Sequence, residues 1–316
     1  MPTKKEPLTP LFRRFRIYLF SAVPLIGMAV YLYGLRPLVM LAISVILAII
    51  SDILVSAMRK RRYESRDLSS VMFAVTFVLM LPASLRYDIV ITGTLFTLLI
   101  KHAFGGYSGC VFQPAAFGLA ASAVCWPDEL FRYPRAFFPI DVRFSSGAML
   151  YDAPAYTIKN GGIPIIDRMD LILGNYPGPM AATFCIVLLA ILVFLIAGKV
   201  MSWHIPVIFL ITVALYAYFF PRIPSSRMDS VLYEILSGIV IFGSVYIVAD
   251  PITSPVNIKA KLLYGFLLGA ATMLFNHYGA FQLGVCFAAL LINPLSPYLD
   301  RKFAPRRTAL RRAGNE

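Results

Sequence analysis

The residues best suited to chemistry gather at two polar breaks in an otherwise apolar chain. The first break contains Gly105, Gly106 and Gly109, followed by Cys110 and Gln113. Glycines at this density allow backbone amides to approach a ligand closely, and they equally allow helices to pack closely in lipid. The sequence leaves both roles open. The side chain of Gln113 adds an amide that can donate and accept hydrogen bonds.

The second break, "ADPITSP", contains Asp250. A carboxylate within a membrane is costly unless it is paired or hydrated, so Asp250 is a candidate for an ion pathway. The alternative is that Asp250 ends a helix at the membrane interface and caps the next turn through the amides of Thr253 or Ser254.

Lys101 and His102 stand next to the first break. They could line that break and hold an anionic or quinonoid ring edge. The more ordinary role is for the Lys101 side chain to extend to the cytoplasmic headgroups while its stem stays in the apolar layer.

The cysteines are expected to be buried apolar thiols, which behave as small hydrophobic side chains. They form no CxxC pair and have no histidine at ligand spacing, so we expect no zinc or iron–sulfur site, and no other metal, on this chain. They are Cys110, Cys125, Cys185 and Cys286.

The composition is that of an integral membrane protein. Of 316 residues, 59% are hydrophobic and 14% are charged, whereas soluble domains carry about 25% charged residues. Ten apolar runs approach the ~20 residues that a helix needs to cross a bilayer. The third and ninth are short, and we expect them to be broken or tilted. The runs are 17–34, 37–57, 68–82, 87–103, 110–126, 179–199, 203–220, 229–249, 261–275 and 279–296.

Five runs, a polar loop and five further runs predict two halves. Because five is odd, a duplicated half would be inverted in the membrane. We therefore expect an all-α integral membrane protein with about ten transmembrane helices in two inverted five-helix halves. Irregular backbone survives at membrane depth only where protein or a cavity surrounds it, so the two breaks point to a central site. The expected divisions are a basic tail 1–16, a first half 17–126, an extracytoplasmic loop 127–178, a second half 179–300 and a basic tail 301–316.

Basic residues predict the orientation in the membrane. The N-terminal tail, the "MRKRRYESRD" loop and the C-terminal tail are all rich in lysine and arginine. Ten spans place these three segments on one side, so we expect both termini of a multi-pass cell-membrane protein in the cytoplasm. The net charge of +13 follows from this topology. No basic groove interleaved with aromatic residues indicates a nucleic-acid partner.

Several segments together carry a resemblance to a known family. They are "KHAFGGYSGCVFQPAAFG", "SWHIPVIFLITVAL", "LSGIVIFGSVYIVADPITSPVN" and "YGAFQLGVCFAALLINPLSPYLDRK". In this order they resemble the D subunit of the Rnf ion-translocating ferredoxin:NAD oxidoreductase and the related B subunit of the sodium-translocating NADH:quinone oxidoreductase. The resemblance runs from about Phe12 to Asp300. It implies a ten-helix subunit of a complex that couples electron flow to the movement of sodium ions or protons.

The resemblance also implies a covalent flavin in the first outward loop, and this chain departs from that pattern. In the family, FMN is esterified through its phosphate to the threonine of an S-G-A-T sequence. Ser146, Gly147 and Ala148 match this sequence, but Met149 stands at the threonine position. A thioether has no hydroxyl to form the ester, so we expect no covalent FMN.

A second, non-covalent flavin is implied near the glycine turn. The family often has "N-x-F-N-P-A" after the glycines, and this chain has "CVFQPA". Gln113 keeps an amide that could pair with the edge of a flavin, whereas Cys110 cannot do so with comparable strength. A reversibly bound riboflavin or FMN is therefore expected here, or else a chain that serves mainly as an ion-conducting scaffold.

The resulting expectation is a membrane subunit of an Rnf-like electron-transport complex, with NAD and iron–sulfur chemistry on the other membrane and redox subunits. The rival hypothesis is a stand-alone channel or transporter for a small solute. It rests on the inverted halves with their breaks, which resemble those of urea and ammonium carriers, and on the departures at both flavin positions. Bound flavin or co-purifying redox partners would discriminate between the two.

Overall fold

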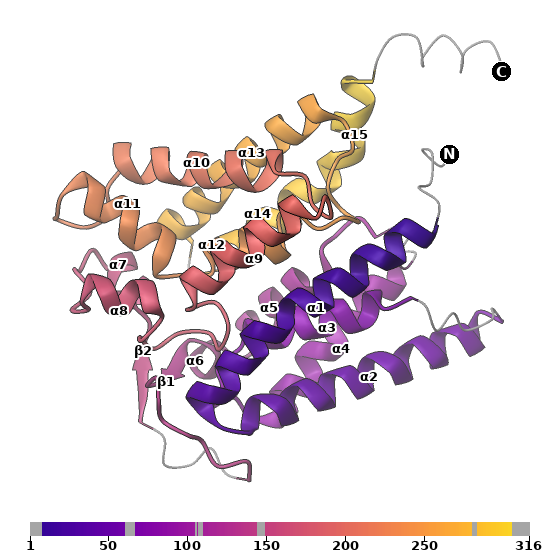
Figure 1. Ribbon diagram of the computed structural model, residues 1–316, viewed down its shortest axis with the longest axis horizontal. Coiled ribbons are helices and arrows are strands. Elements are labelled where there is room, and N and C mark those ends of the chain that lie inside the picture. Colours follow the sequence, from indigo (N-terminus) through magenta and orange to yellow (C-terminus); the bar gives the residue numbers. More distant parts are fainter. Residues whose placement is uncertain are drawn as a thin grey trace.

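The computed structural model describes residues 8–60, 67–104, 106, 110–143, 149–279 and 283–304. Nearly all of the regular structure is helical (Figure 1). The first five helices correspond to the first five apolar runs. They are α1 (Leu8–Tyr33), α2 (Arg36–Met58), α3 (Ser69–Leu79), α4 (Tyr87–Ala103) and α5 (Pro114–Cys125).

The second set of helices follows the polar loop and ends near the C-terminus. It comprises α9 (Cys185–Ala197), α10 (His204–Phe219), α11 (Arg227–Leu236), α12 (Val240–Tyr246), α13 (Ile258–Tyr278), α14 (Gly284–Ile292), a short 3-10 helix η2 (Asn293–Leu295) and α15 (Ser296–Lys302).

The loop between the two sets is folded. It contains α6 (Pro127–Leu130), an antiparallel pair of strands, β1 (Arg132–Pro134) and β2 (Leu150–Asp152), and the short helices α7 (Pro154–Lys159) and α8 (Arg168–Leu173). The strand pair is an addition to the expected all-α fold. Ile158, Leu171 and Tyr176 from the loop pack with Ile223 and Tyr233 in a small hydrophobic cluster of their own. This cluster holds the loop against the segment around α11.

Within the described residues, three helices are long and apolar enough to cross a membrane: Phe12–Tyr33 within α1, together with α2 and α13. A fourth candidate is the pair α11 and α12, which is bent by 50° at a short break. Shorter apolar helices, α3, α5, α9 and α10, lie beside them. These lengths and compositions fit a helical membrane protein.

The structure corrects two details of the expected spans. The run 229–249, expected as one helix, is divided into α11 and α12 by the bend. The run 261–275, expected to be short, belongs to the 21-residue helix α13, because Asn257 caps the helix upstream of the apolar segment by accepting from the Lys259 amide. The short third helix is confirmed, since α3 has 11 residues.

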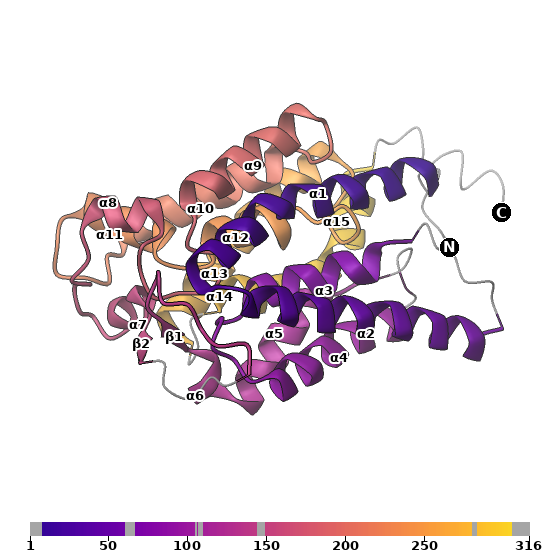
Figure 2. The same ribbon diagram turned by 60° about the horizontal axis from the view of Figure 1, so that its bottom comes forward.

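Helices of the two sets contact each other. Two contacts join the sets: α1 packs against α9, and α5 packs against α14. Within the sets, α1 contacts α3 and α9 contacts α12. Figures 1 and 2 show that α1 begins and α15 ends at the same end of the molecule, while β1, β2, α7 and α8 lie at the other end. The main hydrophobic core extends through both sets of helices.

Candidate functional site

The first polar break is anchored by Gln113, which is fully buried. Its side-chain oxygen accepts from the Ala116 amide (2.7 Å) and caps α5, and its side-chain nitrogen donates to the Tyr246 carbonyl at the end of α12 (3.3 Å). Pro114 occupies the first turn of α5, where a missing N–H costs nothing. One amide therefore starts a helix of the first set and holds the end of a helix of the second set.

Asn293 joins the same junction from η2. With its amide nitrogen donating to the Ala289 carbonyl (2.8 Å) and the Tyr264 hydroxyl (2.6 Å), its oxygen accepts from the Gln113 backbone amide (3.3 Å). All of these polar groups are buried in the protein interior. Their hydrogen bonds satisfy backbone groups at which the regular helices end, as irregular backbone in the interior of a membrane protein requires.

Tyrosines of α1 and α12 extend the junction on its other side. The Tyr18 hydroxyl donates to the Ala249 carbonyl (3.1 Å), and the Tyr246 and Ser21 hydroxyls are hydrogen-bonded (3.0 Å). The rings of Tyr18 and Tyr246 meet edge to face with centroids 6.1 Å apart. Gln113, after the first break, and the end of α12, before the second, are thus brought together although they are far apart in the sequence.

Asp250 is buried beside this junction, with 1% of its surface exposed. Its carboxylate accepts from the Ile252 amide (3.3 Å) and the Thr253 hydroxyl (3.2 Å), and its carbonyl accepts from the Ser254 amide (3.2 Å). The carboxylate therefore caps this turn through the Ile252 amide and the Thr253 hydroxyl, where the alternative named the amides of Thr253 or Ser254. Among the described residues, no lysine, arginine or histidine forms an ion pair with Asp250, so its role in an ion pathway stays a prediction.

The glycine turn divides between described and undescribed residues. Gly105 and Gly109 lie outside the described part of the chain. Gly106 has φ +72°, a left-handed conformation that favours glycine, and a Cβ atom there would meet nothing within 4 Å. Close helix packing is instead the role of Gly118 in α5, where a Cβ atom would lie 1.9 Å from the Thr97 hydroxyl of α4.

The flavin-attachment position is described only at its last residue. Ser146, Gly147 and Ala148 lie outside the described residues. Met149 is 76% exposed immediately before β2. The side chain at this position is open to solvent and lacks an attachable oxygen, so it does not fit a phosphoester-linked FMN.

The non-covalent flavin position also offers little free hydrogen-bonding capacity. Both ends of the Gln113 amide are already engaged, and the Cys110 thiol donates to the Phe112 carbonyl (3.0 Å). A flavin edge at this turn would have to replace the bond from Gln113 to Tyr246. Of the other thiols, Cys185 and Cys286 are buried as expected, whereas Cys125 is exposed.

A buried ionic cluster near the end of α4 corrects the expectation for Lys101. Its side chain is 2% exposed and does not extend to the headgroups. The Lys101 ammonium lies 3.2 Å from the Asp52 carboxylate and 3.6 Å from that of Asp67, and it donates to the Ser70 hydroxyl, which donates to Asp52 (2.6 Å). His102 approaches the same carboxylate at 3.3 Å. We refer to Asp52, Asp67, Ser70 and Lys101 as the lysine cluster.

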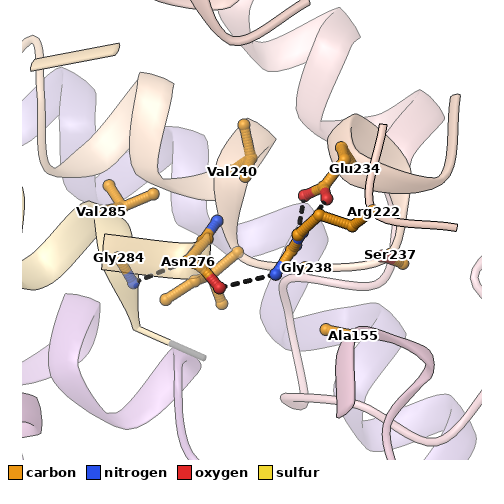
Figure 3. A pocket seen from close by; sticks show the side chains of 10 residues that line it. Ala155, Arg222, Glu234, Ser237, Gly238, Val240, Asn276, Gly284 and Val285 are labelled. Atoms are coloured by element: carbon orange, nitrogen blue, oxygen red, sulfur yellow. Dashed lines mark hydrogen bonds and ion pairs between the residues drawn. The ribbon is translucent and has the colours of Figure 1, made fainter. Parts of the chain in front are cut away.

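A second buried cluster, the arginine cluster, consists of Arg222, Glu234 and Asn276 (Figure 3). Arg222 forms two parallel hydrogen bonds to the Glu234 carboxylate, one of them 2.6 Å long, and donates to the Asn276 carbonyl (2.6 Å). The Asn276 side chain accepts from the Gly284 amide at the start of α14 (3.0 Å). The charged side chains of Arg222 and Glu234 are 9% and 3% exposed.

The arginine cluster borders a small cavity at the bend between α11 and α12. The cavity has a volume of about 20 Å³, roughly enough for one water, and Ser237, Gly238 and Ala155 also line it. Helix α7 covers it from the loop. The loop is packed onto this end of the helices through the Ile158, Leu171 and Tyr233 cluster, and burial together with the nearby Arg222 charge lowers the pKa of Lys159 on α7.

Sequence reasoning missed both clusters because their members are far apart in the chain. A usable signal was present: Asp52 and Glu234 are isolated acidic residues within apolar runs, and such residues require a partner. The sequence does not identify that partner.

Comparison with known proteins assigns the chain to a family. The model of the NQR2, RnfD, RnfE family matches residues 9–309. The chain belongs to this family. The match covers both breaks and both buried clusters.

Relatives within the NQR2, RnfD, RnfE family match along nearly their whole length. The chain is 24% identical to the D subunit of the ion-translocating oxidoreductase complex of Actinobacillus succinogenes, over 91% of each chain. It is 26% identical to the D subunit of the Na(+)-translocating ferredoxin:NAD(+) oxidoreductase complex of Acetobacterium woodii, over 90% of this chain and 86% of the relative. It is 24% identical to the D subunit of the proton-translocating ferredoxin:NAD(+) oxidoreductase complex of Clostridium ljungdahlii, over 92% of this chain and 90% of the relative.

Proposed function

We propose that this chain is the membrane subunit of an Rnf-like complex that couples electron transfer to the translocation of Na⁺ or H⁺. The observation that carries this proposal is the near full-length match to D subunits of ion-translocating oxidoreductase complexes. Those names favour a complex over a stand-alone channel for a small solute. The partners are then the other membrane and redox subunits, within the lipid bilayer of the cell membrane.

The proposed architecture is ten spans in two inverted halves. It is supported by the reciprocal contacts, in which the first helices of the halves, α1 and α9, meet each other and the fifth helices, α5 and α14, do likewise. The two ionic clusters add to this. The lysine cluster joins α2, the start of α3 and the end of α4, and the arginine cluster joins the end of α10, α11 and the end of α13, which are their counterparts in the second half.

The proposed orientation places both termini in the cytoplasm. The start of α1, the end of α2 and the end of α15 lie at one end of the molecule, opposite the folded loop (Figure 1). The sequence places Arg13, Arg59 and Lys302 at or beside these helix ends. An excess of lysine and arginine is typical of the cytoplasmic side.

For the cofactor, we propose that the chain carries no covalent FMN, because Met149 lacks the hydroxyl. Reversible binding of riboflavin or FMN at the glycine turn remains a proposal, supported by the left-handed conformation of Gly106. Asp250 is the proposed ion-pathway residue, since it is buried without a cationic partner among the described residues.

The test is affinity purification of the tagged chain from its native membrane in a mild detergent, with mass spectrometry of the eluate. The proposal predicts that further membrane and redox subunits co-purify in fixed proportion. Recovery of the chain alone, together with rapid solute entry into proteoliposomes that contain only this chain, would favour the transporter hypothesis instead.

A further inference from the structure

The strongest unexplained feature outside the junction is a groove between α1 and α9. It has a volume of about 440 Å³. Two arginines of α1 stand at one end of it, and apolar side chains form the rest. The lining residues are Arg13, Arg16, Ile17, Phe20, Phe194, Gly198 and Val200.

The arginine side chains and the apolar side chains of α1 lie on one helical face. Arg13, Arg16, Ile17 and Phe20 are spaced so that they follow one another along the helix surface. From Arg13 to Phe20 the groove extends about 10 Å along the helix axis. It therefore changes from cationic at the helix end to apolar toward the middle of the span, as a lipid does from headgroup to acyl chain.

Both guanidinium groups are available to a ligand as far as the described residues show. Arg13 and Arg16 are exposed, and neither forms an ion pair with a residue that the structure describes. No aspartate or glutamate is among the described residues that line the groove, so none of these offsets the arginine charges. Guanidinium groups bind phosphate oxygens through paired, charge-assisted hydrogen bonds.

We propose that this groove binds an anionic phospholipid, with the phosphodiester on Arg13 and Arg16 and one acyl chain against Phe20 and Phe194. Basic pockets between transmembrane helices are suited to such headgroups. A free phosphate would leave the apolar part uncovered, and a neutral lipid would leave the arginines unneutralised. Because α1 and α9 come from different sets of helices, the bound lipid bridges the two sets.

The experiment is native mass spectrometry of the delipidated full chain in detergent, with phosphatidylglycerol or phosphatidylcholine added at matched concentrations. We expect tighter binding of phosphatidylglycerol. Replacing one arginine, in Arg13→Gln or Arg16→Gln, should weaken that binding about fivefold, and replacing both about thirtyfold, at about 1 kcal/mol per basic residue. The double Arg→Lys variant, which keeps both charges, should retain most of the affinity.

Two controls separate this groove from general attraction to the basic face. Arg301→Gln removes an exposed charge on α15 outside the groove and should leave binding unchanged. Phe20→Asp keeps both arginines, but it places a carboxylate in the apolar part and should abolish phosphatidylglycerol binding.

Equal binding of the two lipids would overturn the proposal, and so would an unchanged affinity in the double Arg→Gln variant. Displacement of the lipid by millimolar inorganic phosphate would show that the headgroup alone is recognised, which contradicts a site for the acyl chain. Absence of the lipid from the purified complex, with the groove covered by a partner subunit, would likewise overturn it.

Discussion

Gln113 uses one side chain for two purposes: it caps α5 and it holds the end of α12. Gln113→Ala should lower the free energy of unfolding by about 1–2 kcal/mol for the lost cap alone, with a further loss because the buried Tyr246 carbonyl becomes unpaired. Gln113→Glu separates the two effects, since a carboxylate can cap the helix but cannot donate to a carbonyl. SDS-unfolding curves of the purified chain measure both. Identical stability of wild type and Gln113→Ala would contradict this assignment.

Met149 is the residue at which this chain departs most clearly from the flavin-attachment pattern. Because it is exposed and is preceded by Ser146, Gly147 and Ala148, Met149→Thr should restore an acceptor. Co-expressed with a flavin transferase, the variant should give a band that fluoresces under blue light on a denaturing gel, while wild type stays dark. Met149→Val, similar in shape to threonine but without the hydroxyl, is the matched control. A fluorescent wild-type band would refute the expectation of no covalent FMN.

At the scale of elements, the buried ionic clusters tie helix ends together. Lys101→Met leaves the partly buried carboxylates of Asp52 and Asp67 without the ammonium and should lower the free energy of unfolding by up to about 3–5 kcal/mol. Arg222→Met should have a similar effect through Glu234.

The control is Lys302→Met, on the exposed face of α15, which should change stability by less than about 0.5 kcal/mol. The triple variant Lys101→Met, Asp52→Asn and Asp67→Asn also removes the two negative charges. It should recover part of the lost free energy of unfolding, because no unpaired charge is left in the cluster. If Lys101→Met were as stable as wild type, the cluster would not hold these helices together.

The sequence predicted elements better than contacts between them. Proline and glycine marked the breaks correctly, because Pro114 can start a helix but cannot continue one. The bend between α11 and α12 was missed, since the residues around Gly238 are apolar enough to read as one continuous run. The prediction that the Lys101 side chain extends to the headgroups was wrong. Its carboxylate partners come from α2 and the segment before α3, and a local sequence pattern does not predict contacts between distant segments.

At the scale of the whole molecule, the proposed topology has a direct consequence for access to the two faces. In a chain without its native cysteines, Met149→Cys should react with a membrane-impermeant maleimide in intact cells. Val256→Cys, 80% exposed before α13, should react only after permeabilisation. Because both side chains are exposed, a thiol that does not react is on the side of the membrane that the reagent does not reach. Labelling of both in intact cells would contradict the odd number of spans proposed between the loop and Val256, and with it the proposed topology.

The central claim is that the chain serves a complex in which electron transfer drives an ion across the membrane. It is tested most directly in inverted membrane vesicles from the source organism, prepared with and without the gene. The account predicts that deletion abolishes both ferredoxin-dependent NAD⁺ reduction and the accompanying uptake of Na⁺ or H⁺, and that the reintroduced gene restores both together. Unchanged electron transfer and ion uptake in the deletion strain would contradict it.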